Sequence, residues 1–203
     1  MSKNSSRPVG RHFLQIPGPT ALPDRVLRAM DTPIIDHRGP DFAKLAKRCL
    51  DGIKTIFKTT NPVIIYTATG TGAWEAALVN TLSPGDRVLM FETGWFSTLW
   101  KTMAERLGLK PEIIPGDWRS GVDASAIENR LAEDRNHTFK VVAVVHNETS
   151  TGVTSNVSRV RKAIDRAGHP ALLFVDTISS LASIDYRHEE GASTSPWAPH
   201  RRG

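Results

Sequence analysis

Four short segments of this sequence combine residue types that could bind a ligand or do chemistry. The first, TATGTGA at residues 67–73, contains small and hydroxyl residues, among them Thr69, Gly70 and Thr71. Where such a segment opens a helix, its N–H groups and hydroxyls converge on an anion, and the helix dipole favours negative charge there. The segment is not a Walker phosphate-binding loop, because no Gly-Lys-Ser/Thr sequence follows it. It is not a dinucleotide-binding fingerprint either, because Glu75 stands where the third glycine would be. A phosphate cradle and a plain tight turn both stay open on this pattern.

The second and third segments add aromatic and polar groups. Residues 92–96 (ETGWF) include Phe96, whose ring could stack on a planar ligand or pack in the core. Residues 146–152 (HNETSTG) follow the most apolar run of the chain. They must face solvent or a ligand, because burying unpaired polar groups is costly. His146 and Glu148 could be metal ligands, but the pattern supplies no third ligand.

The fourth segment contains a carboxylate, Asp176, directly after the apolar run 172–175. A carboxylate at the end of a buried strand is costly unless a cation or proton donor pairs with it, which makes Asp176 a functional candidate. An anion cradle, an aromatic platform, a hydroxyl cluster and this aspartate together fit a planar, cationic aromatic ring that carries a phosphate. Pyridoxal 5'-phosphate is such a ligand, and the aspartate would keep its ring nitrogen protonated.

The elements that must position these segments alternate between short β-branched runs and longer helical patterns. This alternation indicates an α/β fold with a mostly parallel sheet wrapped by helices. Strands are expected at residues 63–66, 88–91, 112–114, 141–146 and 172–175. Helices are expected at residues 24–30, 41–57, 72–82, 95–107, 124–132 and 157–167, with N-caps at Asp123 and Asn156 and C-terminal stops at Gly108 and Gly168. In such sheets ligands gather at the carboxyl ends of strands, which is where the four segments fall.

Composition and charge narrow the class of protein. The sequence is 39% apolar and 23% charged, which argues against disorder or a fibrous repeat. Its net charge of +5 is spread along the chain, so we expect no nucleic-acid partner. No apolar run reaches the length of a membrane span and the N-terminus does not resemble a secretory signal, so we expect a cytoplasmic protein with no membrane partner. The single cysteine, Cys49, is expected to be a small buried hydrophobe within a helix.

From Phe13 to about Glu190 the sequence resembles class V aminotransferases of the serine–glyoxylate and alanine–glyoxylate type. The resemblance is carried by five segments in the same order: residues 17–20, 69–78, 94–96, 146–153 and 174–181. It implies the large domain of a fold-type I aminotransferase, a pyridoxal 5'-phosphate cofactor and a homodimer. The implied reaction transfers an amino group from serine, or from alanine, to glyoxylate. Residues 34–38 (IIDHR) would lie near the partner's site or form a plain surface loop.

The resemblance also assigns cofactor-binding roles to seven residues: Thr69, Gly70 and Thr71 at the phosphate, Phe96 and Ile178 on the two ring faces, Thr149 at the ring hydroxyl, and Asp176 at the ring nitrogen, where it tunes the cofactor. The Schiff-base lysine that the resemblance implies has no counterpart, since no lysine follows Lys162. No catalytic residue is therefore identified, and we expect this chain alone to be inactive, because transamination needs that amine as its base.

The family's small C-terminal domain also has no counterpart in this sequence. The expected organisation is an N-terminal arm at 1–20, a partial aminotransferase large domain at 21–190 and a tail at 191–203 outside the family pattern. Deleting one base from G/C-rich codons for WGVDVT, the continuation that the resemblance implies, gives GASTSP, the sequence of residues 191–196. This match suggests that the tail is frameshifted. The resemblance implies two further strands, between the strand that ends at Asp176 and the one that ends at Tyr66. Their loss predicts unpaired edges and an exposed apolar face.

Two alternative functions stay open. A dinucleotide-binding oxidoreductase would share the α/β alternation but would need a third glycine in place of Glu75. A non-enzymatic fragment could retain pyridoxal 5'-phosphate noncovalently through the segment at residues 67–73 and Asp176.

Overall fold

The computed structural model describes residues 15–191, which fall into two units that divide between Leu45 and Ala46. The first unit contains α1 (Asp24–Met30) and the beginning of α2 (Pro40–Phe57), and the division falls within α2. Neither helix has a buried residue. The loop at residues 34–38 is also exposed, with Ile34 fully so.

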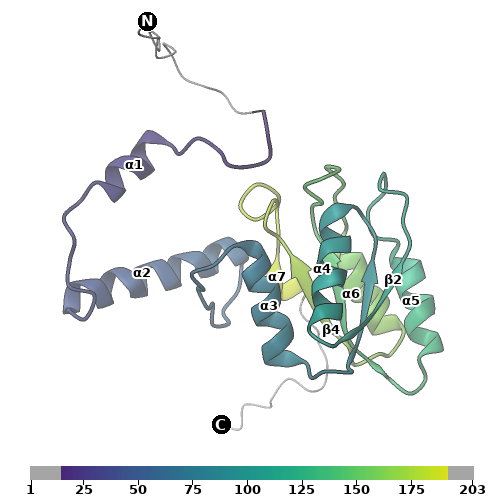
Figure 1. The fold of residues 1–203 in the computed structure, drawn as a ribbon. Helices are drawn as coiled ribbons and strands as arrows, with labels where there is room; N and C mark the ends of the chain where they lie inside the picture. Colours follow the sequence, from purple (N-terminus) through teal and green to yellow (C-terminus); the bar gives the residue numbers. More distant parts are fainter. Residues whose placement is uncertain (1–14, 192–203) are drawn as a thin grey trace, which may run out of the picture. The chain divides into compact units, whose positions relative to one another are not determined.

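The second unit is built on a sheet whose strands all run parallel (Figure 1). Within the described residues the strands are β1 (Arg87–Phe91), β2 (Lys110–Ile114), β3 (Phe139–Val145) and β4 (Leu172–Asp176), in the order β2-β1-β3-β4. The two central strands, β1 and β3, are almost entirely buried. Continuous apolar strands of this kind are typical of a parallel sheet covered on both faces.

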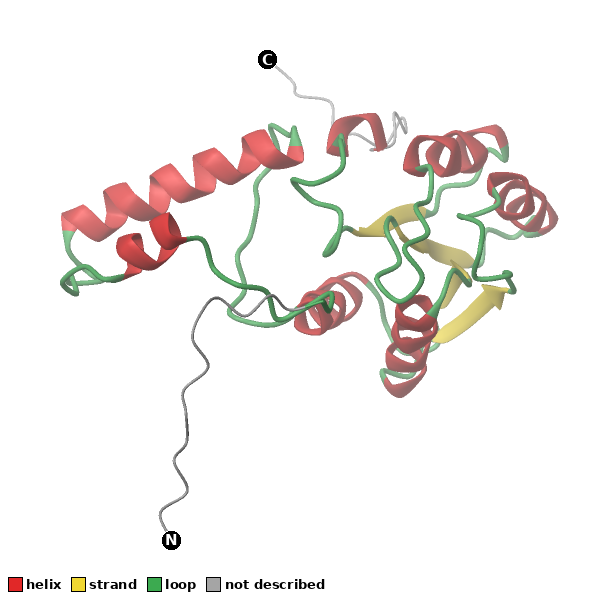
Figure 2. Cartoon of the chain, turned by 90° about the horizontal axis from the view of Figure 1, so that it is seen from above, coloured by secondary structure: helices red, strands yellow, loops and turns green. Residues whose placement is uncertain are grey.

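Helices cover both faces of this sheet, as Figure 2 shows. On one face α3 (Gly70–Thr81) and α4 (Trp95–Arg106) contribute to one core cluster, and on the other face α5 (Ala124–Glu133) and α6 (Val157–Arg166) contribute to a second. A single turn, α7 (His188–Gly191), follows β4. The expected α/β class with a parallel sheet is confirmed.

The two core clusters follow from the period of two along each strand. In β1, Val88 and Met90 point to the α3 and α4 side, while Leu89 and Phe91 point to the α5 and α6 side. Successive side chains of a strand alternate between faces, so a run of apolar residues buries both of its faces at once.

Local signals in the sequence also mark the helix ends. The side chain of Asp123 accepts a hydrogen bond from Ser125 N at the start of α5, and the side chain of Asn156 accepts one from Arg159 N at the start of α6. Gly108 and Gly168 follow α4 and α6 with φ of 77° and 60°, the left-handed conformation that ends helices. The predicted caps and stops are therefore confirmed.

The predicted strand at residues 63–66 is wrong. The structure gives this segment no regular secondary structure, and Ile64, Ile65 and Tyr66 are exposed. A strand needs a neighbour to pair with, and among the described residues β4 ends the sheet without a strand on its outer side. The apolar, β-branched composition of 63–66 favours a strand, but pairing depends on neighbouring strands that the described residues do not supply.

The expected burial of Cys49 is also wrong. Cys49 lies on α2 and is exposed, like most residues of that helix. The helical pattern was correct, but burial depends on what packs against the helix.

The described helices include none with the length and apolar character of a membrane span.

Candidate functional site

The glycine-rich segment forms the N-terminus of α3. The helix begins at Gly70, two residues earlier than predicted, so Thr69 is the N-cap. No side chain forms a capping hydrogen bond there. Because the first N–H groups of a helix have no partner within the helix, those that follow Thr69 remain available to an anion.

Asp176 ends β4 as a buried carboxylate with two neutral donors. Its Oδ2 accepts a hydrogen bond from Trp74 Nε1 at 3.0 Å, and its Oδ1 accepts one from Ile178 N at 2.8 Å. Only 7% of Asp176 is exposed, and burial raises its pKa although both hydrogen bonds act in the opposite direction. No basic side chain of the described residues forms an ion pair with it. A buried carboxylate without a cation is costly, so this position suits a cationic ligand.

Contacts between elements bring the predicted site residues together. Ile178 lies against Gly70, since a Cβ added to that glycine would be 3.3 Å from Ile178 Cγ1. The ring of Trp74 meets the ring of Phe96 edge-on at 6.4 Å, and the same indole reaches Asp176. Thr149 Oγ1 donates a hydrogen bond to Ser179 Oγ at 3.0 Å. The starts of α3 and α4, the 146–152 segment and the end of β4 therefore form one neighbourhood.

A cavity of about 470 Å³ lies beside this neighbourhood. Gly70, Trp74, Asp176 and Ile178 line it, together with apolar residues of β4. Four of the predicted residues are not among its lining residues: Thr69, Thr71, Phe96 and Thr149. Of these, Phe96 contacts Trp74, which lines the cavity. The volume falls within the range of small-molecule sites.

The 146–152 segment does not form a metal site. His146 Nδ1 is 2.9 Å from Ser180 Oγ, and the Glu148 carboxylate accepts hydrogen bonds from the backbone of α4. Burial lowers the pKa of His146, which favours its neutral form. Among the described residues, no three His, Cys, Asp or Glu side chains are grouped to hold a metal ion.

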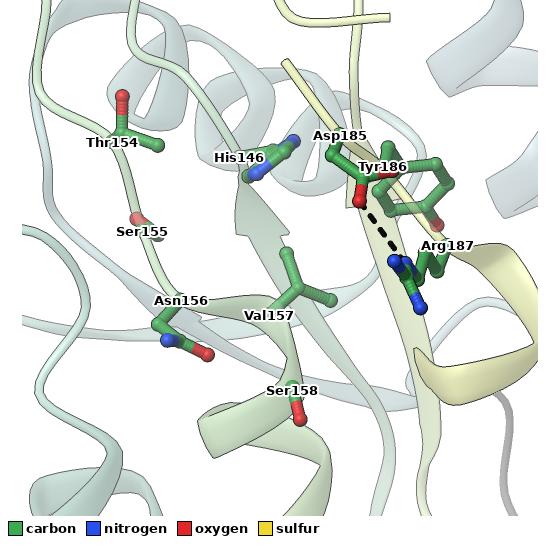
Figure 3. A pocket seen from close by; sticks show the side chains of 9 residues that line it. All are labelled: His146, Thr154, Ser155, Asn156, Val157, Ser158, Asp185, Tyr186 and Arg187. Atoms are coloured by element: carbon green, nitrogen blue, oxygen red, sulfur yellow. Dashed lines mark hydrogen bonds and ion pairs between the residues drawn. The ribbon is translucent and has the colours of Figure 1, made fainter.

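A second cavity of about 420 Å³ lies beside the start of α6 (Figure 3). Its lining includes His146, Asn156, Ser158 and the ion pair between Asp185 and Arg187, but none of the seven residues assigned to the cofactor. Figure 3 shows polar side chains such as Asn156 and Ser158 in this lining, together with the rings of His146 and Tyr186.

Sequence reasoning missed two residues that organise the site. Trp74 received no role from the sequence, yet its Nε1 donates a hydrogen bond to Asp176, 102 residues further along the chain. Glu148 was considered only as a metal ligand, yet it anchors the start of α4. A tryptophan among the small residues of 69–78 was the one available signal for the first, and no local signal pointed to the second.

Known proteins share sequence and fold with this chain. The family described as aminotransferase class-V matches residues 12–190. The chain is 50% identical over 187 residues to the serine–glyoxylate aminotransferase of Methylorubrum extorquens, a match covering 92% of this chain and 46% of the relative. It is 47% identical over 176 residues to the L-aspartate–glyoxylate aminotransferase of Paracoccus denitrificans, covering 86% and 44%.

Solved structures show the same fold. The crystal structure of ureidoglycine–glyoxylate aminotransferase from Bacillus subtilis aligns with a TM-score of 0.80 at 28% identity, covering 87% of this chain and 44% of that one. The chain thus spans less than half the length of these relatives, and it holds part of the fold-type I large domain. These matches also argue against the dinucleotide-binding alternative. With a family match over residues 12–190 and the expected arrangement of strands and helices, the chain belongs to the class-V aminotransferase family.

Proposed function

We propose that this chain forms the cofactor-binding part of a pyridoxal-phosphate-dependent aminotransferase that transfers an amino group from serine, or alternatively alanine, to glyoxylate. The relatives named above are serine–, L-aspartate– and ureidoglycine–glyoxylate aminotransferases. Glyoxylate is common to these names while the amino donor differs. The acceptor is therefore the better supported half of the proposal, and serine follows from the more similar relative.

The observation that carries the proposal is the buried Asp176 carboxylate, which has neutral hydrogen-bond donors and no basic partner among the described residues. A protonated pyridine nitrogen would supply the missing positive charge. The uncapped start of α3 adds an anion site, and Ile178 connects the two because it lies against Gly70. A ligand with a cationic ring and a phosphate fits both features.

In this proposal each residue has a separate binding task. Thr69, Gly70 and Thr71 hold the phosphate, while Asp176 keeps the ring nitrogen protonated. The remaining three contact the ring: Phe96 on one face, Ile178 on the other and Thr149 at the hydroxyl. When bound, the cofactor withdraws electrons from the substrate's α-carbon.

Organisation and assembly belong to the same proposal. We take 1–20 as an arm, 21–190 as a partial large domain and 191–203 as a non-family tail, of which residues 1–14 and 192–203 lie outside the described residues. A homodimer in the cytoplasm is proposed from the family alone. The exposed apolar residues of α1 and α2, including Leu27, Met30 and Phe42, provide surface that a second copy could cover.

The decisive experiment is titration of the chain with pyridoxal 5'-phosphate, followed by absorbance and by quenching of tryptophan fluorescence. Asp176→Asn should weaken binding about 10- to 100-fold, because it removes a hydrogen bond between charged groups. Asp117→Asn is the matched control, since Asp117 is exposed and binds only the backbone and hydroxyl of its own turn. Equal affinity of the two variants would refute the role of Asp176.

One observation favours the alternative of a non-enzymatic fragment that binds the cofactor noncovalently: no lysine lines the cavity among the described residues. Borohydride reduction of the loaded chain separates the two functions. Cofactor fixed covalently to a lysine supports the enzyme, whereas cofactor that dialysis removes after reduction supports the binding fragment.

A further inference from the structure

Glu148 is a fully buried acidic residue that lies at the start of α4. It comes from the 146–152 segment, more than 50 residues away along the chain. Its Oε1 accepts hydrogen bonds from Phe96 N at 3.2 Å and from Ser150 Oγ at 2.7 Å, while its Oε2 accepts one from Ser97 N at 3.2 Å. A buried carboxylate is tolerated when its oxygens are satisfied in this way and it faces a helix N-terminus.

Glu148 and the nearby Ser150 accept hydrogen bonds from all the free N–H groups in the first turn of α4. Ser150 Oγ accepts the hydrogen bond from Trp95 N at 3.0 Å, so three successive N–H groups of α4 bind this one segment. The start of α4 is therefore closed to an outside anion. In contrast, the start of α3 has no side-chain cap and stays open.

Gly94 makes this close approach possible. A Cβ at this position would be 2.5 Å from Glu148 Cγ and 2.6 Å from Ser150 Oγ, closer than real atoms come. Any side chain there would push the 146–152 segment away from α4. The position of Glu148 therefore requires a glycine at residue 94.

Glu148 connects two residues that the proposed function places on the same ring. Phe96 is held through its own N–H, and Thr149 is the next residue after Glu148. Thr149 is fixed from its other side by Ser179, whose Oγ accepts its hydroxyl and donates to Asn147 O at 2.7 Å. Moving the carboxylate would shift the aromatic platform and the hydroxyl partner relative to each other.

We propose that Glu148 is a positioning residue that fixes Phe96 and Thr149 relative to each other. The cofactor ring can then stack on Phe96 while its hydroxyl contacts Thr149. This inference rests on the proposed function, because those two contacts are part of it. Glu148 positions the ring contacts through Phe96 and Thr149, and its negative charge also contributes to the raised pKa of Asp176. The phosphate, held at the start of α3, is outside its reach.

Because the ring contacts and the phosphate site are separate, a positioning role and a merely structural role predict different results. In Glu148→Gln the amide NH2 replaces one acceptor oxygen, so a buried N–H of α4 loses its partner. We expect affinity for pyridoxal 5'-phosphate to fall about tenfold, the value of a lost aromatic contact. Affinity for inorganic phosphate, measured by calorimetry on the same chain, should stay unchanged. Glu128→Gln is the control, since Glu128 forms a partly exposed ion pair with Arg166.

A second readout needs no cofactor. Hydrogen exchange of the Phe96 and Ser97 amides should accelerate in Glu148→Gln and stay unchanged in Glu128→Gln. If Glu148→Gln does not fold, Ser150→Ala takes its place, because it keeps the carboxylate and removes only the hydroxyl that joins Trp95 N to Glu148. Ser150→Ala should accelerate exchange of the Trp95 amide, and it should lower affinity for pyridoxal 5'-phosphate but not for phosphate, less than Glu148→Gln does.

The outcomes distinguish the two proposals. Unchanged exchange at Phe96 and Ser97, or equal loss of phosphate and cofactor affinity, would overturn the positioning role. If the unmodified chain binds phosphate but not pyridoxal 5'-phosphate, the proposed function fails and the cofactor part of this inference fails with it. Faster exchange together with a selective loss of cofactor affinity supports both.

Discussion

The buried carboxylate of Asp176 favours binding of a cationic ligand but lowers the stability of the ligand-free chain. Its carboxylate is buried and has no basic partner among the described residues, and burial raises its pKa above 3.8. Folding therefore shifts this carboxyl toward its protonated form relative to the unfolded chain. A cationic ligand would reverse this shift.

The pH dependence of stability tests this argument. A carboxyl whose pKa is raised by folding contributes stability below its unfolded pKa, and this contribution is lost as the pH rises through the folded-state pKa. The contribution of Asp176 to the stability of the ligand-free chain should therefore decrease as the pH rises above 3.8, and Asp176→Asn should lack this component. Urea denaturation at a series of pH values measures it, and identical pH profiles for both chains would contradict the argument.

Trp74 tunes the same carboxyl, and Trp74→Phe isolates its hydrogen bond while keeping an aromatic ring. The bond from Trp74 Nε1 lowers the pKa of Asp176, so its loss should raise that pKa further. Pyridoxal 5'-phosphate binding should weaken and require a higher pH, as followed by absorbance titration.

Trp100→Phe is the matched control for this change. Trp100 stacks on Trp74 at 5.3 Å, but its Nε1 has no hydrogen-bond partner in the described part of the chain. A shift of the pH profile in the Trp100 variant equal to that in the Trp74 variant would show that ring packing, rather than the hydrogen bond, controls Asp176.

At the scale of elements, Asp134 joins the end of α5 to the start of β3. Its carboxylate accepts hydrogen bonds from Phe139 N at 2.8 Å and Thr138 Oγ1 at 2.7 Å, and it lies 3.2 Å from His169 Nε2. Burial acts to raise its pKa, but these hydrogen bonds outweigh burial and lower the pKa to about 2. The carboxylate therefore stabilises the folded chain in its charged form.

Asp134→Ala should lower the free energy of unfolding at pH 7 by about 2 kcal/mol, because Phe139 N–H is left buried without an acceptor. A carboxyl whose pKa folding lowers contributes stability above its unfolded pKa, so this contribution should disappear as the pH falls from 3.8 toward 2. Urea denaturation measures both effects. Asp51→Ala, which removes an exposed pair with Lys47, should change stability little; an equal loss in both variants would contradict this role.

At the scale of the whole molecule, the two edges of the described sheet differ in protection. The β2 edge contains Lys110 and Pro111, residue types that block pairing with another chain. The β4 edge reads Leu-Leu-Phe-Val before Asp176, with Leu172 half-exposed and an apolar cavity beside it. An unprotected edge of this kind favours pairing with further strands.

The chain should therefore self-associate at micromolar concentrations, and Leu172→Lys should shift it toward the monomer. Sedimentation velocity measures the change. Val79→Lys is the control, because Val79 is an equally exposed apolar residue on helix α3 rather than on the strand edge. Cooperative thermal unfolding of a monomeric, unmodified chain would contradict the prediction.

The sequence by itself determined most elements and their ends, because helix period, strand alternation and caps such as Asp123 and Asn156 depend on neighbouring residues. It also singled out Asp176, since a charged residue after an apolar run stands out locally. Only the tertiary structure decided which distant groups meet: Trp74 with Asp176, and Glu148 with Phe96. It decided equally that residues 63–66 form no strand, because pairing and burial depend on what lies alongside and not on the segment's own composition.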